Sequence, residues 1–535
     1  MKIKRAAAFL LAAAMVFSFV GCKKSGPKNA NKTINYNLSS EPATLDPQIA
    51  VDTSSITVIQ ALFEGLARLD AQGKAQPGAA ESWQANSDST QFTFHLRSAK
   101  WSDKDFGNVT AADFVYAFRR ALDPKTGSAT CSQMYCIKNA KQIHAGKLAV
   151  EQLGVTAKDN KTLVVNLEYS CPDFPILTAQ AVYMPCNEKF FSGTSGRYGL
   201  EPKYTISNGP FSIDGPYGWD HGKTLRLARS AAYAGQSKVL PSGISFSIGT
   251  ISNSIDALKD KTVDAAPIAS SQTSAAKALG CTLSSVQDTV WGLCFNTQSP
   301  VFKNEKIRTA FAQAFDRTAV LSHIPADSSA ADSIMLPGTR LDGQLYRSVS
   351  GGPFYLKQSS TAAQTLAAGK GELSPGSLDS ITVLCPNDNS SKMILNEMIA
   401  AWNKQFKSYF NMKPVSADSL QDSVRSGNYQ VAIYPVKPAG DGPDAVLSLF
   451  VSGTAGNPAG LADPAYDALV NSAQSKSGKE AAAAYAAAEK YLNNKAIFYP
   501  LYYEKSYYAL AKGITGIIFR PYAGGVDFLN AGKLG

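Results

Sequence analysis

Apolar and polar positions alternate in short runs along much of the chain, and stretches of helical periodicity separate these runs. The run FTFHL at 92–96 alternates strictly, which predicts a half-buried strand. Residues 111–122 carry apolar positions at helical spacing. Thr110 is the expected N-cap of this helix, and Asp113 is expected near its positive end. Pro124 and the residue before it should end the helix.

The same pattern predicts strands and helices over the rest of the chain. Strands are expected at 34–38, 162–167, 211–213, 225–227, 244–246, 263–265, 290–295, 381–384, 430–434 and 498–503. Helices are expected at 55–66, 255–258, 305–321, 392–406 and 480–492. Strand, helix and strand follow one another between 381 and 434, and this order predicts a βαβ unit and therefore α/β layers.

Length and composition limit the class of protein. A chain of 535 residues is too long for one ordinary core and predicts two or three lobes. A hydrophobic fraction of 44% with 18% charged residues is ordinary for a globular protein. The net charge of +10 is a mild excess for this size, and no basic run is interleaved with aromatic residues. We therefore expect no nucleic-acid partner.

The N-terminus has the pattern of an export signal. Positive residues at 2, 4 and 5 precede the apolar run 6–20, which is too short to span a bilayer as a mature helix. Gly21-Cys22 follows and resembles a lipobox, which implies lipid attachment to Cys22 and cleavage before it. An ordinary secretory signal with an accidental cysteine is the alternative. Residues 22–33 are polar and predict a flexible tether.

The other seven cysteines do not define a disulfide framework. Because seven is odd, at least one is free or intermolecular. Cys131 with Cys136, and Cys171 with Cys186, could form local bridges, but buried free thiols are favoured. The four histidines are scattered without ligand spacing, so we expect no metal and no cofactor.

No motif of an active site stands out. The chain lacks GxSxG, HExxH, a Walker-type loop and GxGxxG. Ser274 and Lys277 match SxxK, but the accompanying motifs are missing and the match is read as chance. The acidic pairs Asp256/Asp260 and Asp441/Asp444 are read as solvated surface. We expect no catalysis.

Five segments in order do carry a family resemblance. They are NLSSEPATLDPQ at 37–48, FEGL at 63–66, the strand–helix segment at 91–124, NGPF at 208–211 and FNTQSPVFKNEKIRTAFAQAFDR at 295–317. Together they resemble the solute-binding lipoproteins of peptide-type ABC importers, the oligopeptide/dipeptide/nickel-binding family. The resemblance implies capture of peptides or peptide-like solutes and delivery to an ABC permease with its ATPase subunits. It also implies a monomer, lipid-anchored at the outer face of the cytoplasmic membrane.

The resemblance further implies a type II periplasmic-binding-protein-like α/β fold with two large lobes joined by two crossing strands. The expected divisions are 1–21 signal peptide, 22–33 lipidated tether, 34–69 with 190–289 and 500–535 first large lobe, 70–189 inserted small lobe, and 290–499 second large lobe. Two crossings make a hinge, so the cleft between the lobes should close on a ligand.

The resemblance places six positions in this cleft. Val51 and Thr53 match a loop that runs along the ligand, although Thr53 could instead be a helix cap. Thr130 stands where relatives have a tyrosine. Ala439 stands where they have the aspartate that pairs with the peptide α-ammonium, with Lys437 and Asp441 nearby. Either Asp441 replaces this aspartate or the ligand is not a standard peptide, and Lys437 could favour a carboxylate there.

Alternatives of other kinds remain open. Within the class, the protein could bind a nickel chelate, haem, an oligosaccharide or an opine. Outside it, the chain could be a signalling receptor of the same fold or an exported hydrolase.

Overall fold

One sheet runs through the whole molecule in the computed structural model, which describes residues 32–520 and 525–533 except 237, 343, 375, 377, 379–380, 408–409, 439, 455 and 477. Its strands in the described part are β1 (Thr33–Leu38), β8 (Phe211–Ile213), β9 (Trp219–Asp220), β10 (Thr224–Arg229), β11 (Gly243–Ile248), β12 (Ala265–Ile268), β13 (Thr282–Phe295), β14 (Ser329–Ala330), β17 (Thr382–Pro386), β18 (Asn411–Val415), β19 (Val431–Val436) and β20 (Phe498–Leu510). Their order is β18-β17-β19-β13-β20-β12-β1-β11-β10-β8, with β14 on β20 and β9 on β10.

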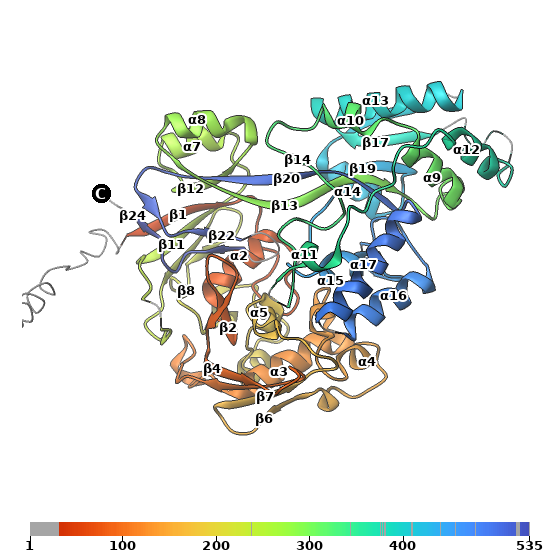
Figure 1. The fold of residues 1–535 in the computed structure, drawn as a ribbon. Helices are drawn as coiled ribbons and strands as arrows, with labels where there is room; N and C mark the ends of the chain where they lie inside the picture. The colour runs from red at the N-terminus through yellow and green to blue at the C-terminus, as the bar shows by residue number, and fades with distance from the viewer. Residues whose placement is uncertain are drawn as a thin grey trace, which may run out of the picture.

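Two long strands join the halves of this sheet. β13 and β20 run antiparallel, from the pair Thr282 and Leu510 to the pair Cys294 and Phe498. At one end β20 pairs with β12, and at the other end β13 pairs with β19. Figure 1 shows β13 and β20 side by side across the middle of the molecule. The sequence predicted only the second half of β13 and the first half of β20. The first half of β13 is largely polar, and Glu504, Lys505 and Ser506 interrupt the apolar run of β20.

The buried apolar residues form clusters on either side of a polar crossing. The clusters built on β1 and β8–β12 extend along β13 as far as Leu283 and along β20 as far as Tyr507. The clusters built on β17–β19 include β13 from Val290 onward and β20 up to Tyr503. We call these two parts of the molecule the first lobe and the second lobe. Residues 284–289 and 504–506, which we call the crossing segment, belong to none of the clusters in the described chain.

A separate four-stranded sheet lies at the bottom of Figure 1. It consists of β4 (Ala80–Ala85), β5 (Gln91–Leu96), β6 (Val155–Ala157) and β7 (Thr162–Asn166), in the order β4-β5-β7-β6. α3 (Ala111–Leu122) follows β5 as predicted. The Asp113 carboxylate accepts from the backbone N–H of Thr110 at 2.7 Å and from its hydroxyl at 3.1 Å, so the predicted start of the helix is confirmed.

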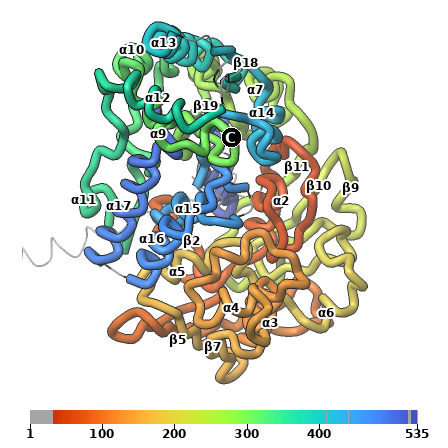
Figure 2. Tube along the Cα trace, turned by 90° about the vertical axis from the view of Figure 1, so that its right-hand side faces the viewer, coloured from red at the N-terminus to blue at the C-terminus, as the bar shows by residue number. Residues whose placement is uncertain are grey.

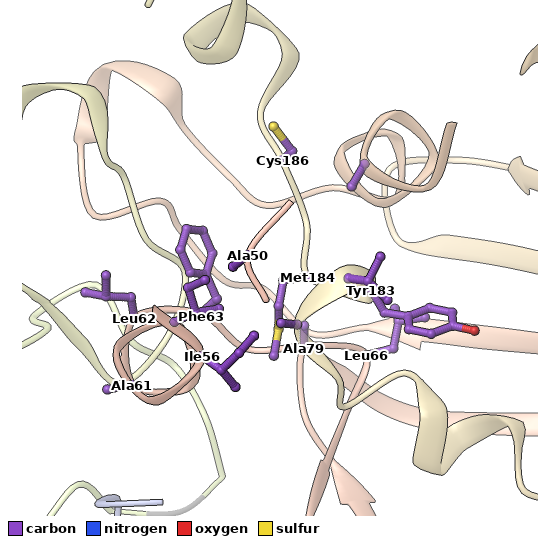
Figure 3. Packing of buried hydrophobic residues seen from close by; sticks show 14 of the residues in the cluster. Ala50, Ile56, Ala61, Leu62, Phe63, Leu66, Ala79, Tyr183, Met184 and Cys186 are labelled. Atoms are coloured by element: carbon purple, nitrogen blue, oxygen red, sulfur yellow. The ribbon is translucent and has the colours of Figure 1, made fainter. Parts of the chain in front are cut away.

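The small sheet shares its core with the rest of the first lobe. α2 (Thr53–Leu62) packs through Ile56, Leu62 and the following Phe63 in the same cluster as the strands of the small sheet. Figure 3 shows these side chains beside Tyr183 and Met184, which come from the segment after the small sheet. The small sheet and the neighbouring strands of the main sheet therefore share one apolar cluster, and a second, smaller cluster of the first lobe lies around Leu258, Ala266 and Ala276.

The second lobe contains the predicted βαβ unit. β17, α13 (Asn389–Phe406) and the parallel β18 succeed one another, and β17 also pairs parallel with β19. The single helix predicted at 305–321 is wrong. The chain forms α9 (Glu305–Gln313) and α10 (Arg317–Leu321), because Asp316 caps the second helix by accepting from the N–H of Thr318 at 2.8 Å.

The remaining helices cover the sheet faces and the lobe edges. They are α4 (Ala140–His144), α5 (Phe174–Leu177), α6 (Glu188–Gly193), α7 (Ser254–Lys259), α8 (Thr273–Ala278), α11 (Tyr346–Ser350), α12 (Ala362–Lys370), α14 (Ala417–Arg425), α15 (Asp444–Leu447), α16 (Pro464–Gln474) and α17 (Gly478–Asn494). The remaining short strands pair as β2 (Ala67–Leu69) with β3 (Ala75–Pro77), β15 (Arg340–Leu341) with β16 (Gln344–Leu345), β21 (Ile514–Thr515) with β24 (Gly532–Lys533), and β22 (Ile518–Phe519) with β23 (Val526–Asp527). Figures 1 and 2 both place α16 of the second lobe next to α4 of the first.

Candidate ligand-binding site

The crossing segment contains an irregularity at Asp288. The register of β13 and β20 shifts there, so that Gln287 opposes Lys505 while Thr289 opposes Glu504. The Asp288 carboxylate accepts from the hydroxyl of Ser506 at 2.9 Å. Bulges bend a strand and raise its local twist, so this position is suited to a change of angle between the lobes.

A second acid lies beside this bulge. The Trp291 indole donates to the Glu504 carboxylate at 2.5 Å, and the Trp291 ring stacks on Tyr502 with centroids 6.0 Å apart. Burial raises the pKa of Glu504, while the hydrogen bond from Trp291 and the charge of Lys437 act in the opposite direction. The two lobes are therefore connected through partly buried polar side chains and not through an apolar contact.

Polar contacts also connect the two lobes away from the bulge. Lys141 of α4 donates to the Asn471 side chain on α16 at 2.9 Å. The Ser270 hydroxyl of the first lobe donates to the Asp327 carboxylate of the second. Gln287 lies on the crossing segment and donates to the Ser329 hydroxyl at 3.3 Å. Contacts of this kind can exchange with water, which makes separation of the lobes inexpensive.

The predicted first-lobe positions lie in two loops. Val51 precedes α2 and is 62% exposed. Thr53 is the first residue of α2 and not its cap, because Asp52 accepts from the Ser55 N–H at 2.8 Å in that role. Thr130 follows α3, and its hydroxyl lies 3.5 Å from that of Ser128.

The predicted second-lobe positions lie in the loop after β19. The Lys437 ammonium lies 3.7 Å from the Asp288 carboxylate. Ala439 lies outside the described residues. The Asp441 carbonyl accepts from the Arg340 N–H at 2.7 Å, which fixes the loop backbone. Burial, and after it the charge of Asp173, raise the pKa of the Asp441 carboxyl.

Two first-lobe residues reach this loop, and sequence reasoning missed both. Asp173 precedes α5 and acts on Asp441 across the interface between the lobes. Gln180 lies so close that a Cβ on Gly440 would be 3.9 Å from its amide nitrogen. No local pattern could reveal these neighbours, because more than 250 residues separate them in the sequence and only the lobe arrangement joins them.

Two cavities open in the first lobe. One of about 40 Å³ lies beside α2, and Gln60 and Gln180 contribute to its lining. Four charged side chains also line it, those of Glu64, Arg68, Arg520 and Asp527. The other, a groove of about 1010 Å³, is lined only by residues between 43 and 200, so it does not lie between the lobes. Gln180 therefore links the small cavity to the interlobe loop.

Chemistry of other kinds has little support in the described residues. Within them, no group of three or more His, Cys, Asp or Glu side chains could hold a metal ion. Ser274 and Lys277 are exposed on the short helix α8. In the same part of the chain no helix is long and apolar enough to cross a bilayer. All seven cysteines after Cys22 are free thiols, so neither of the two possible local bridges is formed.

Comparison with known proteins gives one consistent family. Residues 74–458 match the model of the bacterial extracellular solute-binding proteins, family 5 (middle). The dipeptide-binding protein DppE of Bacillus subtilis is 26% identical over 548 residues, which cover 99% of each chain.

Solved structures of similar fold belong to proteins of the same kind. The substrate-binding domain of an oligopeptide ABC transporter from Bacillus anthracis has a TM-score of 0.77 and 25% identity, covering 95% of this chain and 100% of that one. The Listeria monocytogenes OppA bound to peptide has a TM-score of 0.76 and 24% identity, covering 94% and 99%. The α/β fold predicted from the sequence, of the type II periplasmic-binding-protein kind, is confirmed.

Proposed function

Because the chain belongs to the bacterial extracellular solute-binding proteins of family 5, we propose that it captures oligopeptides or peptide-like solutes outside the cytoplasm and delivers them to an ABC permease with its ATPase subunits. The supporting observation is the pair of antiparallel strands that joins two separate apolar cores through a polar crossing. This arrangement permits closure around a ligand, and the permease can then distinguish the closed, loaded protein from the open one.

The proposed cleft has one wall on each lobe. Val51, Thr53 and Thr130 contribute from the first lobe, and Lys437, Ala439 and Asp441 from the second. An extended peptide needs partners for its backbone and its terminal charges. Asp441 is the carboxylate proposed to receive the peptide α-ammonium in place of the residue at 439, and its neighbour Asp173 adds negative potential from the facing lobe.

Calorimetry tests this assignment. Asp441→Asn should weaken binding of peptides with a free N-terminus by about tenfold or more, since a charge-assisted hydrogen bond contributes about 1.5–3 kcal/mol. The same substitution should have little effect on the affinity for N-acetylated forms of these peptides, because they lack the α-ammonium. Asp418→Asn, at an exposed site on α14, is the matched control and should leave both affinities as they are. Unchanged affinity of Asp441→Asn for the free peptides would remove Asp441 from the site.

We also propose that the protein is a monomer without catalytic activity, anchored through lipid on Cys22. The proposed division of the chain follows the expected ranges, with the return from the second lobe at 504–506, because Leu501, Tyr502 and Tyr503 pack in the second-lobe clusters. A thermal-shift screen with peptides, sugars and metal chelates tests the ligand class. Stabilisation by a single non-peptide compound would favour a specialist binder, and turnover of any compound would contradict the absence of catalysis.

A further inference from the structure

The small cavity beside α2 lies next to the loop that carries the proposed second-lobe wall. Gln180 lines this cavity, and a Cβ on Gly440 of that loop would be 3.9 Å from the Gln180 amide nitrogen. Phe63 and Met184 also line the cavity, and Figure 3 shows both in the packing around α2. A side chain of a solute held between the lobes therefore has a short path past Gln180 into the cavity.

The charged side chains around the cavity neutralise one another. Arg68 donates to the Asp527 carboxylate at 3.1 Å and to the Glu64 carboxylate at 3.4 Å, and Arg520 donates to Asp527 at 3.1 Å. These four side chains are between 3% and 14% exposed. Burial acts to raise the pKa of Asp527, but the charges of Arg68 and Arg520 outweigh it and hold this pKa below its ordinary value. Both cations therefore already have an anionic partner.

Charge balance and size limit what the cavity can hold. A charged group inside it would find no spare counter-charge, and burying such a group is costly. The volume of about 40 Å³ has room for about three water molecules, since one needs about 10–15 Å³ of such space. The same volume accepts a small planar group but not an aromatic ring. The cavity therefore suits a small, uncharged group.

Two lining side chains have unused hydrogen-bonding capacity. The Gln180 Oε1 atom is buried, and neither atom of this amide has a hydrogen-bond partner among the described residues. The terminal torsion of a glutamine is soft, so the amide can turn its oxygen or its nitrogen toward the cavity. Glu64 Oε1 accepts from Arg68 and, at 2.6 Å, from the Tyr233 hydroxyl, whereas no donor in the described part of the chain reaches Oε2. Buried polar atoms normally have partners, so a hydrogen-bonding group is expected here.

We propose that this cavity is a side-chain pocket of the ligand cleft and that it takes the primary carboxamide of an asparagine or glutamine in a bound peptide. The inference rests on the proposed capture of peptides. A carboxamide is uncharged, donates through two N–H groups and accepts through its carbonyl oxygen. It can pair reciprocally with the Gln180 amide and donate its second N–H to Glu64 Oε2. A carboxylate or an ammonium of similar size would bring in an unpaired charge.

Calorimetry with alanine tetrapeptides tests the pocket. Each position is replaced in turn by Gln, Met or Glu, which have similar lengths, and in a second series by Asn, Leu or Asp. At one position the wild type should bind the carboxamide peptide about threefold to tenfold more tightly than its apolar counterpart, the range expected for one or two hydrogen bonds. The acidic peptide should bind no more tightly than the apolar one, because its charge has no partner in the pocket.

Gln180→Met removes the free amide and keeps the length of the side chain. This variant should lose the preference for the carboxamide and keep the wild-type affinity for the apolar peptide. Gln84→Met, at an exposed position on β4, is the matched control and should retain the preference. Circular dichroism melting checks the fold of both variants, and the wild-type comparison decides the question without either.

The outcomes separate this inference from the proposed function. If no tetrapeptide bound, peptide capture itself would be contradicted. If peptides bound but no position favoured the carboxamide, the cavity would hold only water and the pocket would be overturned while peptide capture stood. A preference that persisted in Gln180→Met would overturn the pocket in the same way.

Discussion

The Lys437 ammonium lies 3.7 Å from the carboxylate of Asp288, so a side chain expected near the ligand also contacts the bulge in the crossing segment. Lys437 is 61% exposed, and ion pairs at such positions contribute little to stability. We predict that Lys437→Met changes the free energy of unfolding by less than about 1 kcal/mol in urea titrations. A loss of more than about 2 kcal/mol would show that the pair is a structural element of the crossing.

The buried pair of Asp46 and Arg120 should behave differently. Arg120 donates to the Asp46 carboxylate at 2.8 Å and also to the Gln48 side chain, and both members of the ion pair are almost fully buried. Arg120→Met would leave a buried carboxylate without its cation, which costs about 3–5 kcal/mol. Urea denaturation measures this loss. Lys223→Met, which removes the exposed pair with Asp220, is the control and should cost less than about 1 kcal/mol.

Gly65 is required where two backbones approach closely. A Cβ at this position would lie 2.1 Å from the Thr178 carbonyl oxygen, an atom that cannot rotate away. We predict that Gly65→Ala lowers the free energy of unfolding by about 1–3 kcal/mol or more. Gly193→Ala meets no atom within 4 Å and should be neutral or slightly stabilising. Equal melting temperatures for the two variants would contradict the close approach.

The Asp441 carboxyl should make stability depend on pH. Its folded-state pKa is raised by burial and by Asp173, against a smaller opposite effect of Arg340. An acid with a raised folded pKa contributes stability that is fully present below its unfolded pKa and is lost as the pH rises through the folded pKa. Asp441→Asn removes this contribution. The variant should therefore lose less stability than the wild type as the pH rises above about 4.

Urea titrations at a series of pH values measure this difference. Comparison with Asp418→Asn, on the exposed surface of α14, corrects for the removal of one negative charge. Asp444 and Glu489 also have carboxyl pKa values raised by burial, but both are present in all three proteins and their effects cancel. If the free energies of unfolding of wild type and Asp441→Asn changed with pH in parallel, Asp441 would have the same pKa in the folded and unfolded chains.

Local physics made part of the fold predictable. The alternation in β5 and the capping residues of α3 act within a few positions, and both appear as expected. The split between α9 and α10 was missed because Asp316 lies inside a continuous apolar periodicity. A capping side chain there competes with helix propagation, and the pattern alone does not reveal which prevails.

The site was less predictable, since its parts meet only through tertiary structure. Asp441 could be singled out from its sequence context, but its neighbour Asp173 lies on the other lobe. The bulge at Asp288 has no signal in a strand that already reads as polar.

The separation of the two apolar cores by a polar crossing has a thermodynamic consequence. Heat-capacity changes follow the apolar area that leaves water, and the two lobes share no apolar cluster in the described chain. Hinge rotation by itself should therefore contribute little to the heat capacity of binding. The heat-capacity change on complex formation would then report mainly on the solute and the wall that covers it.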